Sequence, residues 1–408
     1  MLIEFSVANF RSILGRQTLS LVAGSGAEHA SRNLIAGEHE GLRVLRSAVL
    51  YGPNAAGKSN VLRALATLRQ LVEETATRVQ EGQRLNVAPF LFEKETAAKP
   101  SEFEIIFIAD DGVRYHYALA VGPERVYREW MVAYPNARPQ RWFEREYDEK
   151  TGQYTWWFGP HFQGEKAERK VWREFTRSNS LFLSTAIQLN NDQLKPAFGW
   201  ITQKLIVLTA GIGWNPFLSL ELLREDAGRE QIMRYMRAAD IGIDRLELLE
   251  EDVAPAPTGD LPVGGVRVNF EVGLPQGATA TAPKRFQVRA WHKQVGSGQE
   301  VALDIQEESD GTKKLFEFVG GWIRALEWGA TLFVDELDRS LHPLMTHFLV
   351  GLFHGATNSK NAQLIYTTHD TTLLDTDFLR RDQVWFVEKD DRRSTRLYSL
   401  LEYSPRKG

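Results

Sequence analysis

One stretch of eight residues, GPNAAGKS from Gly52 to Ser59, constrains this chain more than any other part of its sequence. It matches the pattern G-x-x-x-x-G-K-[ST], and it lies between an apolar run at 47–51, typical of a buried strand, and a helical pattern. A strand, a glycine-rich turn and a helix in this order form the context that a phosphate-binding loop requires. The alternative is a turn that only caps a helix. Because the context fits on both sides, the sequence favours an α/β fold with a nucleotide site.

The residues of this loop have separate tasks towards a nucleotide. Backbone N–H groups can surround phosphate oxygens at the start of a helix, Lys58 can neutralise the β- and γ-phosphates, and the Ser59 hydroxyl can bind Mg²⁺. We therefore predict ATP and Mg²⁺ as the bound species. The residues predicted to contact the nucleotide here are Asn54, Ala55, Ala56, Gly57, Lys58, Ser59 and Asn60.

Two adjacent carboxylates, Asp335 and Glu336, follow the apolar run at 331–334. A phosphate-binding loop needs an acid at the end of a neighbouring strand to hold Mg²⁺, and Asp335 has that place. Glu336 would point towards the other side and could polarise the attacking water as a general base. Taken alone, Asp335 could equally cap the next helix, with Glu336 a solvated neighbour. The loop at 52–59 favours the metal-binding and catalytic roles.

Two further segments are placed where a nucleotide enzyme could use them. ESDGTKKL, at 308–315, puts Ser309 and Gly311 at the start of a helix, which makes a second N-terminus able to receive an anion. LIYTTHD, at 364–370, ends a strand near His369, whose imidazole could sense a γ-phosphate. In isolation Ser309 would more often be a helix N-cap, and His369 a surface residue. Both residues follow the phosphate-binding loop in the sequence, Ser309 before the two acids and His369 after them. This order favours the nucleotide roles.

This order of motifs resembles that of ABC/SMC-type ATPase heads. More narrowly, the segments VANFRSI, GPNAAGKSN, ESDGTKKL, DELDRSLHP, YTTHD and VWFVEK are together similar to the bacterial AAA-type ATP/GTP-phosphatase family of ABC-like ATPases. That family includes abortive-infection and OLD-like defence ATPases. The resemblance covers nearly the whole chain and is weakest at about 159–281. It implies an α/β fold: an ABC-type ATPase head with a P-loop core sheet, an antiparallel β lobe and a helical insertion.

The resemblance also implies how the site is assembled. Lys58, Glu336 and His369 would be the catalytic residues, and Ser59 and Asp335 the metal ligands. Arg11, in the segment Phe10 to Ser12, would lie near the nucleotide. Ser309 and Gly311 of one subunit would close over the ATP held by another, so that a homodimer carries two composite sites. Arg339 and His342 would lie across the same seam; the alternative for these two is a local salt bridge and a helix cap.

Some positions depart from the family's transporter-type pattern. Residues 308–312, Glu-Ser-Asp-Gly-Thr, replace the transporter signature LSGGQ, and His342 replaces the aspartate that usually ends the D-loop. Transport is therefore disfavoured. The Q-loop would fall near 87–92, but this segment contains no glutamine.

The element pattern predicts three regions: 1–158 and 283–408 as the two halves of the ATPase head, and 159–282 as a helical insertion with loops. We expect hairpins within 103–121 and 141–158, and strands at 47–52, 331–334 and 363–367. Helices are expected at 165–177, 192–208, 221–239, 313–327 and 342–354. The Pro- and Gly-rich segments 253–265 and 274–284 are predicted to be loops around one short strand.

Composition limits the partners. Lys+Arg 49 against Asp+Glu 53 gives a net charge of −4, so a nucleic acid would have to bind a local basic patch. Such a patch could be the helix with Lys166, Arg169, Lys170, Arg173 and Arg177, although an ordinary solvated face has the same pattern. The absence of cysteine excludes disulfides and cysteine-held metals and fits a cytoplasmic protein. No apolar run reaches the roughly 20 residues that cross a bilayer, so no membrane is expected.

The leading functional hypothesis follows from the resemblance. It is an ATPase that dimerises around ATP and controls a separate effector protein, a nuclease or a toxin, in antiphage defence of the abortive-infection type. No Toprim nuclease pattern follows His369, so the effector is expected on another chain. The alternative is a DNA-repair or DNA-remodelling ATPase similar to RecF or an SMC head. A structural protein with a degenerate site is disfavoured, because every phosphate-handling position is present.

Overall fold

A computed structural model of the chain describes residues 1–35, 41–208, 216–239, 241–252, 284–339 and 341–403. The chain divides into two compact units, one formed by Met1–Asn215 with Gly321–Gly408 and the other by Pro216–Gly320. These boundaries differ from the expected insertion at 159–282. The helices between residues 159 and 215 pack within the first unit, and the second unit extends past 283 to the middle of the helix Asp310–Trp328.

A six-stranded sheet forms the core of the first unit, in the order β16-β15-β3-β14-β13-β9. Four of its five strand pairings are parallel, and the pairing of β15 with β16 is antiparallel. Its strands are β3 (Ser47–Tyr51), β9 (Leu205–Leu208), β13 (Thr331–Val334), β14 (Gln363–Thr367), β15 (Val384–Lys389) and β16 (Thr395–Ser399). Every residue of β3, β13 and β14 is buried, as expected for parallel strands covered on both faces. The predicted strands at 331–334 and 363–367 are confirmed.

Strand β9 was not expected, because the sequence predicted one helix over 192–208. The helix α6 (Lys195–Gly199) instead passes through a π-helical turn at Trp200–Lys204 and then becomes extended. Residues 205–208, Leu-Ile-Val-Leu, pair in parallel with β13. Two β-branched residues beside an open sheet edge favour the strand, so tertiary pairing overrides the helical pattern.

An antiparallel sheet of seven strands forms the second layer of this unit, in the order β2-β1-β4-β5-β6-β7-β8. The strands are β1 (Leu2–Ala8), β2 (Gln17–Ser20), β4 (Ser101–Ile108), β5 (Arg114–Val121), β6 (Val126–Tyr134), β7 (Gln140–Asp148) and β8 (Gln153–Phe158). Both predicted hairpins are confirmed, as β4–β5 and β7–β8. The expected antiparallel β lobe is therefore present.

The helix α2 (Lys58–Glu74) joins the two sheets. Its residues Val61, Leu62 and Leu65 belong to one hydrophobic cluster with residues of both sheets, and they are almost fully buried. On the other face of the core sheet lies α10 (Pro343–His354). Shorter helices complete the unit: α1 (Ala30–Asn33), α3 (Lys94–Ala97), α4 (Lys166–Phe175) and α5 (Phe182–Gln188). The parallel core, the antiparallel lobe and the P-loop helix match the expected arrangement of an ABC-type ATPase head.

The second unit combines helices with a small sheet. It contains α7 (Phe217–Leu223), α8 (Asp226–Ala238), the antiparallel strands β10 (Arg245–Asp252), β11 (Lys284–Lys293) and β12 (Glu300–Asp304), and the first half of α9 (Asp310–Trp328). The helix expected at 221–239 is thus two helices. The predicted loops at 253–265 and 274–284, with the strand between them, lie almost wholly outside the described residues.

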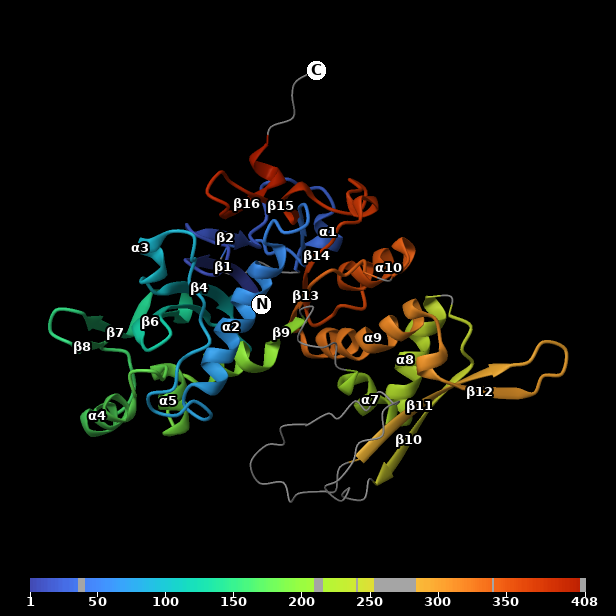
Figure 1. Ribbon diagram of the computed structural model, residues 1–408, viewed down its shortest axis with the longest axis horizontal. Helices are drawn as coiled ribbons and strands as arrows, with labels where there is room; N and C mark the ends of the chain where they lie inside the picture. Colours follow the sequence, from blue (N-terminus) through green and yellow to red (C-terminus); the bar gives the residue numbers. More distant parts are fainter. Residues whose placement is uncertain (36–40, 209–215, 240, 253–283, 340, 404–408) are drawn as a thin grey trace. The chain divides into compact units, whose positions relative to one another are not determined.

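Segments from the two ends of the sequence lie side by side in the first unit. Figure 1 shows β16 beside β2, and the backbone N–H of Leu397 donates to Oε1 of Gln17 at 2.8 Å. The backbone N–H of Leu14 likewise donates to the hydroxyl of Ser394 at 3.0 Å. These contacts bring the turn after β1 and the start of β16 together, next to the P-loop.

Candidate functional site

The predicted site gathers where three parallel strands end. Strands β3, β14 and β13 are neighbours in the core sheet, and their carboxyl ends meet at one edge. The loop 52–57 follows β3, Asp335 follows β13, and His369 follows β14. Ligands of open α/β sheets bind outside the carboxyl ends of the strands. This edge is therefore the candidate nucleotide site.

The P-loop has a backbone that only small residues allow. Gly57 has a φ of 109°, and a Cβ atom there would lie 2.0 Å from Oγ1 of Thr395. A Cβ at Gly52 would lie 2.1 Å from the carbonyl oxygen of Val387. Ala55 has a φ of 63°, in the left-handed region. The glycines of the motif are thus required by the neighbouring strands β15 and β16 as well as by a ligand.

Side chains from both ends of the chain brace this loop. The Thr395 hydroxyl donates to the carbonyl of Ala56 at 2.8 Å and lies 2.8 Å from Oγ of Ser12. Asn60, predicted to contact the nucleotide, donates from Nδ2 to the same Ser12 hydroxyl at 2.7 Å. In this structure the Asn60 side chain therefore holds the turn beside the loop.

Arg11 lies in that turn, exposed and with a φ of 49°. Its backbone N–H donates to the carbonyl of Ala88 at 2.8 Å. Partial desolvation of the guanidinium, together with the positive charge of Arg63 from α2, lowers the pKa of Arg11. Two positive charges near the start of the P-loop helix favour an anion beside this turn.

Lys58 is buried, and its ammonium is bound by neighbouring groups. Its Nζ donates to the carbonyl of Gly52 at 2.7 Å, contacts that of Pro53 at 3.3 Å, and lies 3.2 Å from Nε2 of His369. Burial lowers the pKa of Lys58, and the carboxylates of Asp335 and Glu336 oppose this effect. The structure thus brings together Lys58 and His369, two of the predicted catalytic residues.

Asp335 is only 1% exposed, and its two carboxylate oxygens differ in their environment. Oδ1 accepts a hydrogen bond from the Thr367 hydroxyl at 2.7 Å, whereas Oδ2 is buried with no hydrogen-bond partner among the described residues. A buried carboxylate oxygen without a donor is costly, and a bound cation would remove that cost.

This environment fits the predicted Mg²⁺ ligand set of Ser59 and Asp335. The described residues contain no group of three or more His, Asp or Glu side chains that could hold a metal alone. Mg²⁺ commonly takes one or two carboxylates together with water and substrate phosphates, so a small protein ligand set is what it needs.

Glu336 adopts a left-handed backbone with a φ of 52°. Its N–H donates to the Thr367 hydroxyl at 2.7 Å, and its Oε2 lies 3.1 Å from Nη1 of Arg339. His342 is the N-cap of α10, with Nδ1 accepting from the N–H of Leu344 at 3.3 Å. For Arg339 and His342 the structure thus shows the local salt bridge and cap that the sequence allowed as the alternative.

Three residues at this edge were not predicted: Thr367, Asp338 and Thr395. Thr367 contacts both acids, and Asp338 accepts from the backbone N–H of His369 at 3.2 Å through Oδ2. Asp338 and Thr367 stand inside the quoted segments DELDRSLHP and LIYTTHD, which was the available signal. No sequence pattern pointed to Thr395, because its partners are more than 300 residues away.

Ser309 and Gly311 belong to the second unit. Oγ of Ser309 accepts from the N–H of Thr312 at 3.2 Å, so Ser309 caps α9, and Gly311 lies in the first turn of that helix. The preceding Glu308 is held by His292 of β11, with Oε1 and Nε2 2.6 Å apart. Ser309 is thus the helix N-cap that the sequence allowed as the alternative, and its hydrogen bond orders the first turn of α9.

The basic residues of α4, and Arg177 just after it, contact carboxylates and backbone carbonyls. Lys170 and Arg173 lie 3.8 Å and 3.9 Å from Glu174, and Arg177 donates to the carbonyl of Thr75 at 3.0 Å. Glu165 and Glu168 form a capping box at the start of the helix. These contacts match the solvated face considered from the sequence.

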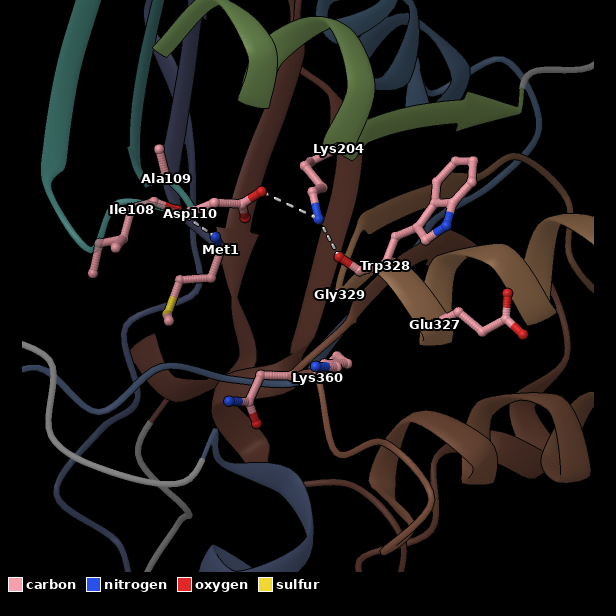
Figure 2. Close-up of a pocket in the computed structure, with 10 residues that line it drawn as sticks. Met1, Ile108, Ala109, Asp110, Lys204, Glu327, Trp328, Gly329 and Lys360 are labelled. Atoms are coloured by element: carbon pink, nitrogen blue, oxygen red, sulfur yellow. Dashed lines mark hydrogen bonds and ion pairs between the residues drawn. The ribbon is translucent and has the colours of Figure 1, made fainter. Parts of the chain in front are cut away.

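A cavity of about 470 Å³ lies at the opposite edge of the core sheet (Figure 2). Its lining residues Lys204, Gly329 and Lys360 precede the strands β9, β13 and β14, so they stand at the amino ends of these strands. Lys204 is paired there with Asp110 at 3.3 Å. The cavity is therefore separate from the nucleotide edge.

None of the helices in the described part of the chain combines the length and the apolar character needed to span a membrane.

A family model described as "AAA domain, putative AbiEii toxin, Type IV TA system" matches residues 47–176 and 215–375, well over half of the chain. The matched segments contain the P-loop, the turn at Ser309, the acid pair and His369. The match confirms the resemblance to AAA-type, ABC-like ATPases that the motifs indicated. No curated protein sequence matches the chain.

Solved structures of SMC heads are among those to which the chain shows similarity. The SMC head bound to the C-terminal winged-helix domain of ScpA is 13% identical, with a TM-score of 0.41 over 100% of this chain and 98% of that one. The SMC head domain from Thermotoga maritima is 12% identical, with a TM-score of 0.41 over 98% of each chain. The SMC head with an extended coiled coil, bound to the C-terminal domain of ScpA derived from Pyrococcus furiosus, is 12% identical. Its TM-score is 0.37 over 98% of this chain and 96% of that one.

Proposed function

The chain belongs to this family of AAA domains, and we propose that it is an ATP hydrolase that closes as a dimer around ATP and thereby controls a separate effector protein. The observation that carries the proposal is the convergence of Lys58, His369, Asp335 and Glu336 at one edge of the core sheet. Lys58 contacts His369, and the two acids share one threonine hydroxyl.

The P-loop residues would bind the phosphates of ATP. In this structure Lys58 donates to the carbonyls of its own loop, and phosphate oxygens would take over these hydrogen bonds. Bound by Ser59 and Asp335, Mg²⁺ would supply positive charge opposite the β- and γ-phosphate oxygens. The turn with Arg11 adds a further cation beside α2.

Glu336 would act as the general base. Its carboxylate would accept a proton from the water that attacks the γ-phosphorus, while the bond from that phosphorus to the β-phosphate oxygen breaks and yields ADP and phosphate. For this step the carboxylate of Glu336 must first separate from the guanidinium of Arg339. This ion pair is largely exposed, at 66% and 35% of the two side chains, so opening it costs at most about 1 kcal/mol. Its presence in the resting chain is therefore compatible with catalysis.

We place Ser309 and Gly311 of a second copy opposite the P-loop. The backbone N–H groups and the dipole at the start of a helix favour an anion such as a γ-phosphate. This arrangement makes hydrolysis depend on dimer closure, and ATP would act as the switch for the assembly.

A complementation experiment tests the composite site. Lys58→Ala and Ser309→Arg should each be inactive alone. Mixed in equal amounts, about half of the dimers are heterodimers, and each has one intact site because the good P-loop and the good Ser309 come from different chains. About a quarter of the wild-type ATPase rate should return. If both residues served the same ATP within one chain, the mixture would stay inactive and the composite site would be refuted.

The proposed effector is a separate protein. Its support is the family description, which refers to an AbiEii toxin and a type IV toxin–antitoxin system. We propose a role in antiphage defence of the abortive-infection type. In this role the ATP-closed and open states bind a nuclease or toxin with different affinities.

Affinity capture of the tagged chain tests this role. Glu336→Gln would supply the closed state and Lys58→Ala the empty state, both in cells that carry the neighbouring genes. A toxin or nuclease bound in one state and lost in the other would support the proposal. Recovery of nucleic acid alone in both states would contradict it and favour DNA repair.

A further inference from the structure

Thr367 is the last residue of β14 and has no exposed surface. Its hydroxyl donates to Oδ1 of Asp335 at 2.7 Å and accepts from the backbone N–H of Glu336 at 2.7 Å. A hydroxyl has one hydrogen to donate and lone pairs to accept with, so both bonds form at once. One buried side chain thereby holds both acids of the site.

The two hydrogen bonds act on different properties of the acids. The bond to Oδ1 fixes the rotation of the Asp335 carboxylate, and this leaves Oδ2, which has no hydrogen-bond partner among the described residues, as the oxygen for a metal. The bond from the N–H of Glu336 holds a backbone with a φ of 52°, which a non-glycine residue adopts only under constraint. Strand β14 thus sets both the metal-facing oxygen and the path of the chain into Glu336.

We propose that Thr367 is a positioning residue that sets metal affinity and the placement of the general base. This inference rests on the proposed ATP hydrolase function. A metal ligand depends on the groups that hydrogen-bond to it, and removing such a group typically lowers metal affinity or activity about 10–100-fold. The hydroxyl itself touches neither substrate nor metal.

The chain offers a matched control on the neighbouring strand. Thr331 is also buried, at 1% exposed, and its hydroxyl lies 3.1 Å from Oε1 of Gln363. It starts β13, at the end of the strand pair away from the acids. Thr331→Val therefore removes a buried strand hydroxyl with its hydrogen bond, but leaves Asp335 and Glu336 supported.

The test compares Thr367→Val, Thr367→Ser and Thr331→Val in the full chain. Binding of Mn²⁺, as a spectroscopic substitute for Mg²⁺, is titrated by electron paramagnetic resonance with a non-hydrolysable ATP analogue present. Binding of the analogue without metal is measured separately. Thr367→Val should weaken Mn²⁺ binding about 10–100-fold and lower kcat, with metal-free analogue binding unchanged. Thr367→Ser should restore Mn²⁺ binding to near the wild-type value, and Thr331→Val should match the wild type.

Two results would overturn the inference: wild-type Mn²⁺ affinity in Thr367→Val, or an equal loss in Thr331→Val. Circular dichroism and thermal unfolding check that each variant is folded, and Thr367→Ala takes the same test if the valine variant does not fold. A wild-type chain that binds no nucleotide would instead refute the ATPase proposal itself. The two failures are thus distinguished by the wild-type titration.

Discussion

Nζ of Lys58 lies 3.2 Å from Nε2 of His369, so the ammonium of the P-loop donates to the imidazole at the end of the adjacent strand. In the proposed function, a phosphate bound to Lys58 would compete for its ammonium and leave Nε2 of His369 free to turn towards the ligand. The contact therefore links the occupancy of the P-loop to the orientation of the residue expected to sense the γ-phosphate.

Replacing Lys58 tests the P-loop. Lys58→Ala removes the buried cation that meets the phosphates, and each hydrogen bond to a charged group contributes about 1.5–3 kcal/mol, or roughly 10–100-fold in affinity. We expect at least this loss for ATP in a calorimetric titration. Lys150→Ala, in the turn between β7 and β8, is the control and should bind as the wild type does. Equal affinity in both variants would refute the assignment.

Replacing Glu336 separates binding from hydrolysis. Glu336→Gln keeps the shape of the side chain but removes the negative charge, so ATP should bind with the wild-type affinity while kcat falls about 10²–10⁴-fold. The ATP-bound dimer should accumulate and elute as a dimer in size-exclusion chromatography. Hydrolysis at the wild-type rate would exclude Glu336 as the base.

The trapped variant also tests the regulation. If closure restrains the effector, cells with Glu336→Gln should keep it silent during infection. If opening restrains it, the variant should be toxic without phage. A trapped dimer that changes neither the binding nor the activity of the partner would contradict the regulatory proposal.

The contact between Gly57 and Thr395 predicts a strict requirement for glycine. In Gly57→Ala the new Cβ would lie 2.0 Å from Oγ1 of Thr395, at a φ of 109°. The hydroxyl must move away from Ala56 and Ser12, so we expect ATP affinity to fall about 10-fold or more and stability to fall by roughly 1–3 kcal/mol. In Gly351→Ala, within α10, the new Cβ would meet no atom within 4 Å outside its own helix, so ATP affinity should stay unchanged and stability should rise by about 0.5–1 kcal/mol. Calorimetry and urea unfolding measure the two effects.

His354 predicts how stability depends on pH. Burial lowers the pKa of His354 from 6.5 to about 3, with the nearby charges of Arg32 and Arg46 adding to the effect and His29 and His347 contributing. The folded chain therefore keeps the imidazole neutral below pH 6.5, whereas the unfolded chain takes up a proton there. Its stabilising effect is complete above that pH and is lost as the pH falls towards 3.

From His354 alone, the free energy of unfolding should change with pH by at most about 1.4 kcal/mol per pH unit. Urea unfolding at about pH 7 and about pH 5 measures it. His354→Gln should show a smaller fall in the free energy of unfolding between these conditions, and His347→Gln, on the same helix, should fall as the wild type does. Equal slopes in the wild type and in His354→Gln would show that His354 does not govern this range.

The sequence predicted those parts of the site whose chemistry is local. The motif around Lys58 and the acids after β13 could be identified because a P-loop and its acid need fixed residue types beside strands. The same holds for β13 and β14, whose continuous apolar runs indicate buried parallel strands. Such signals depend only on neighbours along the chain.

The contacts that the sequence did not predict depend on residues far apart in the chain. Leu205–Leu208 is a strand because it can pair with β13 at the edge of the core sheet. Thr395 can hydrogen-bond to Ala56 because β16 pairs with β15 at the other edge of that sheet. Neither relation leaves a local pattern. The two helices at 217–238 are a smaller example. The break between them, at Arg224 and Glu225, lies within a stretch whose sequence pattern predicted one continuous helix.

The bond between Thr395 and Ala56 joins residues 339 positions apart. A ribosome that has just made the P-loop must therefore add all of these residues before the loop can receive its brace, which takes roughly 17–70 s at ordinary rates of synthesis. During this interval the nascent chain has the motif without its support. Prematurely terminated chains that stop before β16 would share that defect, so full nucleotide affinity would report that translation has passed Thr395.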